Sequence, residues 1–263
     1  MPQPPHRAEL WHLDRHRALG SLGALSATID LERPDWGLQL LRGDAAIVAG
    51  SLLAVSTNDN RPPTQTTQWP AKLTDAYVRG PDLVASYVGD ANWPYSPQVY
   101  WSVALQEPDR EPDSEIVASL ALVVSIQTDR LDTHPRIDVR SSLRADEVLL
   151  VSVVGDDLLV DSHVEGIQGI DPRTSACGIL WRLPGGELSY TEVMPTSDFR
   201  RLSVDRAASG QFQSHWELFA EFLEKGVIRR ARLQSLFLPR ENDVQLTAEA
   251  CQAIEKRPLP LTT

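Results

Sequence analysis

The sequence predicts an all-β protein, a large antiparallel two-sheet sandwich (supersandwich-like) with short helices at the termini. Apolar and polar residues alternate with a period of two in many short segments, which is the pattern of half-buried strands. Turn residues such as Gly, Pro, Asn and Asp separate these segments at short intervals. Roughly twelve to sixteen strands are expected, which is too many for one small sandwich and suits a large one.

The first half of the chain contains strands that end at clear turns. The segment 25–31 alternates apolar and polar residues and ends at Arg33-Pro34-Asp35. Gly80-Pro81-Asp82 predicts a hairpin turn, and Gly50-Ser51 predicts another. The polar segment 58–70 contains prolines and is expected to be a surface loop, which makes it a candidate binding loop. Strands are expected over residues 25–31, 36–41, 46–48, 52–55, 75–79, 83–88, 98–105 and 116–126.

The second half of the chain also contains predicted strands that are separated by turns. Hairpins are expected over 148–160 and over 179–193, with turns at Gly155 and at Pro184-Gly185-Gly186. We interpret 216–238 as a long late hairpin, because residues 227–238 are strand-like and need an antiparallel neighbour. A helix over 216–223 is the alternative. Good helix formers over 247–256 predict a short closing helix.

We divide the chain into an N-terminal arm, residues 1–20, and one large β-sandwich domain, residues 21–263. The arm is Pro-rich and then basic and aromatic, and the spacing of Leu10 and Leu13 suits a short helix or a docking arm. Charges and a proline interrupt the apolar pattern inside the domain, which leaves two halves, 21–130 and 143–263, as an alternative division.

The composition argues against several classes of partner. The formal net charge of −11 opposes binding to nucleic acid, which needs clustered Lys and Arg, and binding to anionic membranes. The most apolar stretch, residues 116–126, is too short to cross a bilayer as a helix. No nucleotide-binding motif occurs, so no cofactor is expected. With only Cys177 and Cys251, free buried thiols in a cytoplasmic protein are expected, and a disulfide is the alternative.

Two His/carboxylate pairs are the candidate catalytic residues. His163 and Glu165 lie two residues apart, as do His215 and Glu217. In a strand, residues at this spacing project from the same face, so each pair could perform general acid/base chemistry if it lines a cleft. Polar pairs on a solvated sheet face are the alternative. Neither reading predicts the oligomeric state.

No metal site is expected. His12 and His16 are four residues apart, a spacing that helix-borne metal ligands share. Arg15 and Arg17 would repel a cation at this position. The segment is therefore interpreted as a solvated arm.

The candidate ligand-binding residues are concentrated in residues 75–101. This stretch holds six of the chain's twelve Trp and Tyr residues. Aromatic faces stack on sugar C–H groups, and planar carboxylate, amide and guanidinium groups bind sugar hydroxyls; aromatic residues that serve only the sheet are the alternative. The residues assigned to the site are Tyr77, Arg79, Asp82, Trp93, Tyr95, Tyr100 and Trp101.

Two arginines of a later strand complete the candidate site. Arg230 and Arg232 share a strand face and could hold an anionic ligand by forked hydrogen bonds. Ion pairs with Glu217, Glu221 and Glu224 on the neighbouring segment are the alternative.

In outline the sequence resembles the galactose-mutarotase-like β-supersandwich proteins, which include aldose epimerases and domains of many carbohydrate-active enzymes. The resemblance rests on chain length, strand density, the opening segment 25–41 with Gly37, and the late hairpin over 216–238. It implies a sheet face suited to sugars. Epimerases of that family place an aromatic segment directly after one catalytic His. Here His134 precedes Pro-Arg-Ile and His163 precedes Val-Glu, so no catalytic residue is carried over.

These observations predict a carbohydrate- or polyol-binding protein that need not be catalytic. A sugar-active enzyme, an epimerase or a lyase that uses the His/carboxylate pairs, is the second hypothesis. A protein-interaction scaffold that uses exposed sheet edges and the N-terminal arm is the third.

Overall fold

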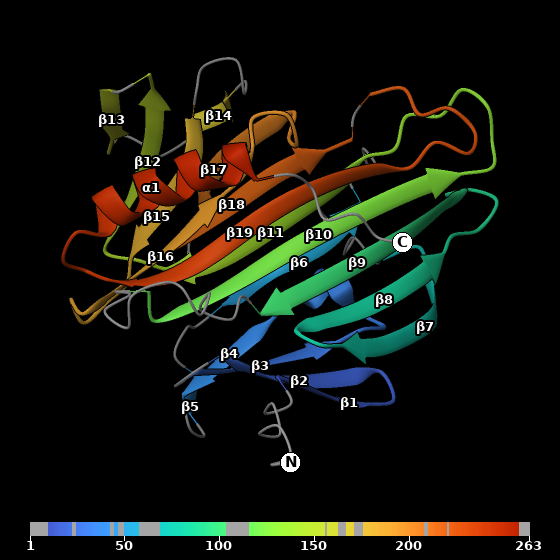
Figure 1. The fold of residues 1–263 in the computed structure, drawn as a ribbon, viewed down its shortest axis with the longest axis horizontal. Helices are drawn as coiled ribbons and strands as arrows, with labels where there is room; N and C mark the ends of the chain where they lie inside the picture. Colours follow the sequence, from blue (N-terminus) through green and yellow to red (C-terminus); the bar gives the residue numbers. More distant parts are fainter. Residues whose placement is uncertain are drawn as a thin grey trace, which may run out of the picture.

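The computed structural model describes residues 10–22, 25–42, 45–46, 50–57, 69–103, 116–155, 157–162, 167–170, 176–207, 210–219 and 221–257. Within these ranges the chain forms nineteen strands, a 3-10 helix, η1 (Pro34–Trp36), and one α-helix, α1 (Asp243–Lys256). The strands are arranged in three antiparallel sheets (Figure 1).

The largest sheet has nine strands in the order β13-β12-β15-β16-β19-β10-β9-β8-β7. Its two central strands, β10 and β19, have eleven residues each and pair in register from Ala118–Phe237 to Ile126–Arg229. The strands of this sheet are β7 (Lys72–Arg79), β8 (Asp82–Val88), β9 (Tyr95–Val103), β10 (Ala118–Thr128), β12 (Glu147–Val154), β13 (Asp157–Asp161), β15 (Ala176–Arg182), β16 (Leu188–Val193) and β19 (Arg229–Pro239).

Two five-stranded sheets form the second layer. The central sheet has the order β14-β17-β18-β11-β6, and the N-terminal sheet has the order β1-β2-β3-β4-β5. An isolated bridge between Leu38 and Leu52 joins the two sheets. In Figure 1, β6, β11 and β18 lie behind β10 and β19. The strands are β1 (Trp11–Asp14), β2 (Arg17–Leu22), β3 (Leu25–Asp30), β4 (Gln39–Arg42), β5 (Ala45–Ala46), β6 (Ser51–Thr57), β11 (Ile137–Arg144), β14 (Ile167–Ile170), β17 (Arg201–Arg206) and β18 (Gln211–Leu218).

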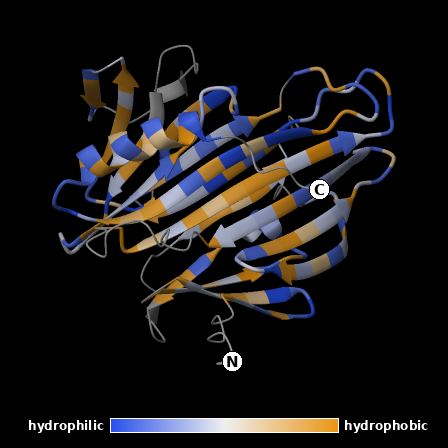
Figure 2. Cartoon of the chain, in the orientation of Figure 1, coloured by the Kyte–Doolittle hydropathy of each residue, from blue (hydrophilic) through white to orange (hydrophobic). Residues whose placement is uncertain are grey.

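The core lies between the nine-stranded sheet and the two smaller sheets. On β10, Leu120, Leu122 and Val124 are buried in this core, and Ser119 and Ala121 face the other side. Hydrophobic and hydrophilic bands alternate along the strands in Figure 2. One continuous cluster of buried side chains includes residues of all three sheets. The predicted all-β architecture of two large layers is confirmed.

The helix α1 covers part of the outward face of the nine-stranded sheet, where it contacts β12, β15, β16 and β19. At its start, the Asp243 carboxylate accepts hydrogen bonds from Arg182 at 3.0 and 3.1 Å and from Ser189 at 2.7 Å. At its end, Arg232 Nη2 donates to the carbonyls of Ile254 and Arg257, which a helix leaves without intrahelical partners. The predicted closing helix is confirmed. No helix among the described ranges is long and apolar enough to cross a membrane.

The N-terminal segment differs from its prediction. Residues 11–22 form the β1–β2 hairpin and not a short helix. Trp11 packs over Gly20, where an added Cβ would lie 2.6 Å from the indole ring, so the glycine leaves the space that the ring needs. Exposed and buried residues alternate along β2, which is the pattern of a strand. This pattern decides the structure of the segment, although the spacing of Leu10 and Leu13 suited a helix.

Two predicted hairpins are wrong, and three are confirmed. Residues 211–218 pair with β11 and β17, whereas 229–239 pair with β10 and β16, so the expected long late hairpin is split between two layers. Likewise β5 pairs with β4 and β6 pairs with β11. In β18, buried residues alternate with exposed or half-buried ones, so the facing sheet covers its apolar face and the strand does not need β19 beside it. The hairpins with turns near Gly80, Gly155 and Gly185 form as predicted.

The expectation of free thiols is wrong. Cys251, one of the two cysteines of the sequence, is disulfide-bonded. Its side chain is buried where α1 packs on Val193 of β16. Disulfides persist in oxidising compartments and are rare in cytosolic proteins, and the cytoplasmic location stays a prediction.

A glutamate is buried in the core between the two layers. Glu192 of β16 is fully buried, and its carboxylate accepts four hydrogen bonds. Ser141 and Tyr190 (2.9 Å) donate to Oε1, and Ser214 (2.9 Å) and Trp216 (2.8 Å) donate to Oε2. Burial raises the pKa of Glu192, and the four donors only partly oppose this rise.

The raised pKa of Glu192 gives stability a predictable pH dependence. Between the ordinary glutamate pKa of 4.5 and the raised value, the folded state binds the proton more tightly than the unfolded state does. The free energy of unfolding should therefore fall as pH rises through this window. Urea unfolding at a series of pH values checks this, and Glu192→Gln should flatten the profile. Asp198, whose pKa burial also raises, should keep a slope of the same sign in the variant. An unchanged slope would contradict the assignment.

Candidate functional site

The outward face of the central sheet carries two rows of mainly polar side chains. Strand pairing places the members of each row directly opposite one another across β6, β11, β18 and β17. The residues that alternate with them, such as Val139 and Trp216, are buried in the core, so both rows point away from it. The rows are Ser56–Asp138–Glu217–Arg201 and Ala54–Arg140–His215–Ser203.

An aspartate, a histidine and an arginine meet on this face. Asp138 Oδ1 lies 2.9 Å from His215 Nε2, and Asp138 Oδ2 accepts a hydrogen bond of 3.0 Å from Arg140 Nη2. The Asp138 side chain is fully buried, whereas those of His215 and Arg140 are 25% and 27% exposed. The acidic group thus lies beneath two partners that reach solvent.

Among the described residues, four buried polar atoms of this face have no hydrogen-bond partner. Two of them, Asp138 Oδ1 and His215 Nε2, lie 2.9 Å apart as an ion pair, and neither makes a hydrogen bond to another described residue. Ser56 Oγ, beside Asp138 in the same row, and Arg140 Nε also lack a partner. Buried polar groups without partners are uncommon in folded proteins and often mark a place where a water, ion or ligand binds. We call Ser56, Asp138, Arg140 and His215 the central-sheet cluster.

The central-sheet cluster has the groups that proton transfer needs. A carboxylate next to one imidazole nitrogen orients the ring, while the other nitrogen is left to accept or donate a proton. Glu217 projects from the same face, directly opposite Asp138. A guanidinium beside the aspartate can bind a ligand oxygen while it neutralises the buried charge.

The structure places one of the two predicted His/carboxylate pairs. His215 and Glu217 share the outward face of β18, as their spacing predicted. Their catalytic role stays a prediction. His163 and Glu165 lie outside the described residues.

Six of the nine predicted ligand-binding residues share a different surface, the outward face of the nine-stranded sheet. The pairing register places Tyr77, Val84, Tyr100, Val123 and Arg232 in one row across β7, β8, β9, β10 and β19. Neighbouring rows contain Arg79 and Asp82, and Arg230. The middle of this face is closed, because Val84, Tyr100 and Val123 form a small buried cluster.

Most of these polar groups bind one another. Tyr100 donates to Gln98, which in turn donates to Ser86 at 2.9 Å. Asp82 accepts from Ser102 at 2.5 Å and lies 3.7 Å from Arg79. Arg232 binds the end of α1, as described above. This surface is therefore largely satisfied by its own hydrogen bonds, unlike the central-sheet cluster.

The other three predicted aromatic residues are buried in the core. Trp101 is 0% exposed, Trp93 is 5% exposed and Tyr95 is 9% exposed. Trp93 and Tyr95 stack edge to face at 5.0 Å, and Trp93 also packs against Trp69. Their surroundings are those of structural side chains, and a ligand-binding role for them stays a prediction.

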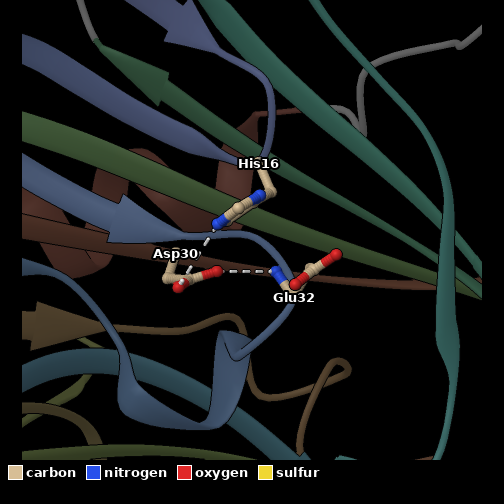
Figure 3. Close-up of side chains that lie close together, drawn as sticks. All are labelled: His16, Asp30 and Glu32. Carbon is tan, nitrogen blue, oxygen red and sulfur yellow. Dashed lines mark hydrogen bonds and ion pairs between the residues drawn. The ribbon is translucent and has the colours of Figure 1, made fainter.

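One group of the described residues has the composition of a metal site. Ligand atoms of His16, Asp30 and Glu32 lie within 4.8 Å of one another (Figure 3). Asp30 accepts a hydrogen bond from the Glu32 backbone N–H at 3.0 Å and lies 3.8 Å from Arg17. The arginine opposes a cation here, as it did in the sequence-based prediction, and exposed acidic groups often occur without a metal.

Sequence reasoning did not find Ser56, Asp138 or Arg140. His215 and Glu217 are close in sequence, but the other three residues come from β6 and β11, which are joined to β18 only by long-range pairing. One local pattern could have pointed to them. Asp138 and Arg140 alternate with buried Ile137 and Val139, as a polar pair on one strand face does.

No model of a protein family matches the sequence, and no curated protein sequence matches it. Solved structures, in contrast, are similar in fold. A candidate aldose 1-epimerase from Escherichia coli K12 aligns with a TM-score of 0.55 and 8% identity over 83% of this chain and 97% of its own. A TPR-domain containing protein from Parabacteroides distasonis aligns with a TM-score of 0.53 and 10% identity over 84% of this chain and 47% of its own.

A third similar structure is an α-N-acetylgalactosaminidase from Bifidobacterium bifidum. It aligns with a TM-score of 0.52 and 13% identity over 88% of this chain and 38% of its own. At these identities the likeness concerns the fold alone. The fold that the chain shares with these structures agrees with the β-supersandwich resemblance seen in the sequence.

Proposed function

We propose that this protein binds a carbohydrate or a similar polyol at the central-sheet cluster. The observation that carries the proposal is a set of four buried polar atoms with no hydrogen-bond partner in the described part of the chain, one each on Ser56, Asp138, Arg140 and His215. An unsatisfied buried polar atom costs about 1–3 kcal/mol, so a ligand that pairs with several of them gains affinity.

The chemistry of the four atoms favours hydroxyl groups as partners. Asp138 Oδ1 can only accept while it is ionised, Arg140 Nε can only donate, and Ser56 Oγ can do both. A sugar hydroxyl both donates and accepts, so adjacent hydroxyls can serve an acceptor and a donor at once. The fold agrees with this reading, because the similar structures include proteins named as a candidate aldose 1-epimerase and an α-N-acetylgalactosaminidase.

Binding can be tested with a glycan array and with calorimetric titration of any sugar that the array identifies. Asp138→Ala and His215→Ala should each weaken binding at least about tenfold, since 1.4 kcal/mol corresponds to a factor of ten. Gln213→Ala is the matched control, because Gln213 lies on the same strand and the same outward face two residues from His215. Equal affinities for all three variants, or no bound glycan at all, would contradict the proposal.

A catalytic role is the second candidate, and the 2.9 Å contact between His215 and Asp138 favours it. With Asp138 holding the ring, His215 would exchange a proton with a bound sugar, and Glu217 would act as the second acid/base group. Exchange between the anomers of glucose and galactose, followed by proton NMR, should then be faster with protein than without it. His215→Gln should abolish the acceleration. A protein that binds sugar without any acceleration would remain a binding protein only.

A second binding surface is proposed on the outward face of the nine-stranded sheet. Tyr77 is 37% exposed there, with Arg79 and Asp82 in the adjacent row, so its ring is available for stacking on a sugar. Tyr77→Ala separates the two surfaces. It should leave binding at the central-sheet cluster unchanged and weaken only a ligand that binds to β7 and β8.

A further inference from the structure

The buried carboxylate of Glu192 and the central-sheet cluster lie on opposite faces of the same strands. Three of the four donors to Glu192 belong to β11 and β18. Ser141 follows Arg140 in sequence, and Ser214 and Trp216 flank His215. Because successive side chains of a strand point to opposite faces, Glu192 holds both strands from the core side directly behind the cluster.

A third strand is tied into the same network. Ser141 Oγ accepts a hydrogen bond of 2.9 Å from the backbone N–H of Leu53 in β6. Leu53 has a left-handed φ of 52°, which a bulky side chain seldom adopts, and the β6–β11 register shifts beside it. This shift decides which residues of β6 face outward, and Ser56 of the cluster is one of them.

The contact between His215 and Asp138 depends on the geometry of these strands. Asp138 is directly opposite Glu217, and Arg140 is directly opposite His215, so the histidine reaches the aspartate along a diagonal. Diagonal neighbours in an antiparallel pair are separated by about 7–8 Å at the backbone, and the side chains must span that gap. A small change in the twist or spacing of β11 and β18 therefore alters the contact directly.

We propose that Glu192 is a positioning residue, which sets the geometry of His215 and Asp138 through its hydrogen bonds to Ser141, Ser214 and Trp216. This inference rests on the proposed function, because it assigns Glu192 to the same site. Glu192 itself touches neither ligand nor reacting atoms. It acts from the core face, and its two oxygens keep β11 and β18 in one fixed relation to β16.

The test compares the loss of single hydrogen bonds to the same carboxylate. Ser141→Ala removes a donor from β11, a strand of the cluster, and Glu192→Gln replaces an acceptor oxygen with a donor. Tyr190→Phe is the matched control, because it removes the second donor to Oε1 from β16, which carries no residue of the cluster. The imidazole nitrogen resonances of His215, assigned with His215→Gln in the full-length protein, report the hydrogen bonding of the ring.

Ser141→Ala and Glu192→Gln should shift the His215 nitrogen resonances by several parts per million towards those of a solvent-exposed histidine. Tyr190→Phe should leave them in place, even where it lowers the melting temperature as much as Ser141→Ala does. Equal shifts in Ser141→Ala and Tyr190→Phe, or no shift in either, would overturn the inference. If Glu192→Gln does not fold, the comparison of Ser141→Ala with Tyr190→Phe still tests the positioning role of Glu192.

This readout needs no ligand, so it separates the inference from the proposed function. Glycan titration of the parent protein is the second measurement. A protein that binds no glycan but shows the selective shift retains the positioning role and loses the proposed ligand. A protein that binds glycan at the cluster without the selective shift retains its function and loses the role of Glu192.

Discussion

Replacing Trp101 with alanine is expected to lower the free energy of unfolding by about 3–5 kcal/mol, the usual cost of removing a large core aromatic side chain. Trp101 is 0% exposed and belongs to the main core cluster on the inward face of β9. Chemical denaturation monitored by circular dichroism measures the loss. The same variant, where it remains folded, should bind any sugar with parental affinity.

Two further variants serve as controls for the stability loss of Trp101→Ala. Trp101→Phe should cost less, since it keeps most of the apolar volume and removes an indole N–H that has no hydrogen-bond partner among the described residues. Tyr77→Ala, on the exposed face of the same sheet, should change stability by less than about 0.5 kcal/mol, as surface substitutions usually do. A stable Trp101→Ala variant that had lost sugar binding would show that Trp101 serves a ligand and not the core.

Replacing Asp243 with alanine should cost about 2–3 kcal/mol, because charge-assisted hydrogen bonds are the strong ones and Asp243 is buried where α1 begins. The loss of unfolding free energy should be smaller than the loss from breaking a fully buried ion pair. Arg182 is 30% exposed and keeps its 2.8 Å contact with Glu147, so water and a second carboxylate still solvate it.

Glu249→Ala is the matched control for Asp243→Ala, because Glu249 lies on the exposed side of the same helix. It should be nearly neutral. Both variants should be unfolded with the Cys251 disulfide intact, so that the covalent tether of α1 is the same in each. Equal losses for the two variants would mean that the contacts of Asp243 contribute little to the docking of α1.

The strands were predictable because their alternation is local. In β3 the period of two is visible without any knowledge of the neighbours, β10 is visible as a short apolar run, and the turns near Gly80 and Gly155 mark hairpins. The pairing of β18 and β19 was not predictable in this way. Each has a buried inward face, and the sequence between them does not tell whether a turn or a crossing between layers connects them.

The aromatic residues of β9 show that the alternation of side chains along a strand could have separated core residues from surface residues in the sequence. Trp101 alternates in phase with Val99 and Val103, and all three are buried in the core. Tyr100 alternates with Gln98 and Ser102, which face outward. The sequence-based site counted all aromatic residues over 75–101 and so combined residues of both sheet faces. The two faces can be separated by looking two residues before and after each aromatic residue, because those neighbours lie on the same face and are either polar or apolar.

Of the central-sheet cluster, only His215 was predictable, together with Glu217 on the same face. His215 and Glu217 follow from spacing within one strand, because side chains two residues apart share a face. Asp138, which lies 2.9 Å from His215, comes from another strand, and only the β11–β18 register brings it there. Such a register depends on the packing of the whole sandwich, so no local pattern fixes it.

Amide NMR mapping of a glycan titration tests the central claim most directly. If the central-sheet cluster is the binding site, the perturbed amides should lie on β6, β11 and β18, around Ser56, Asp138 and His215, and His215→Ala should abolish the perturbations. Perturbations confined to β7, β8 and β9, around Tyr77 and Asp82, would contradict the claim and place the ligand on the outward face of the nine-stranded sheet.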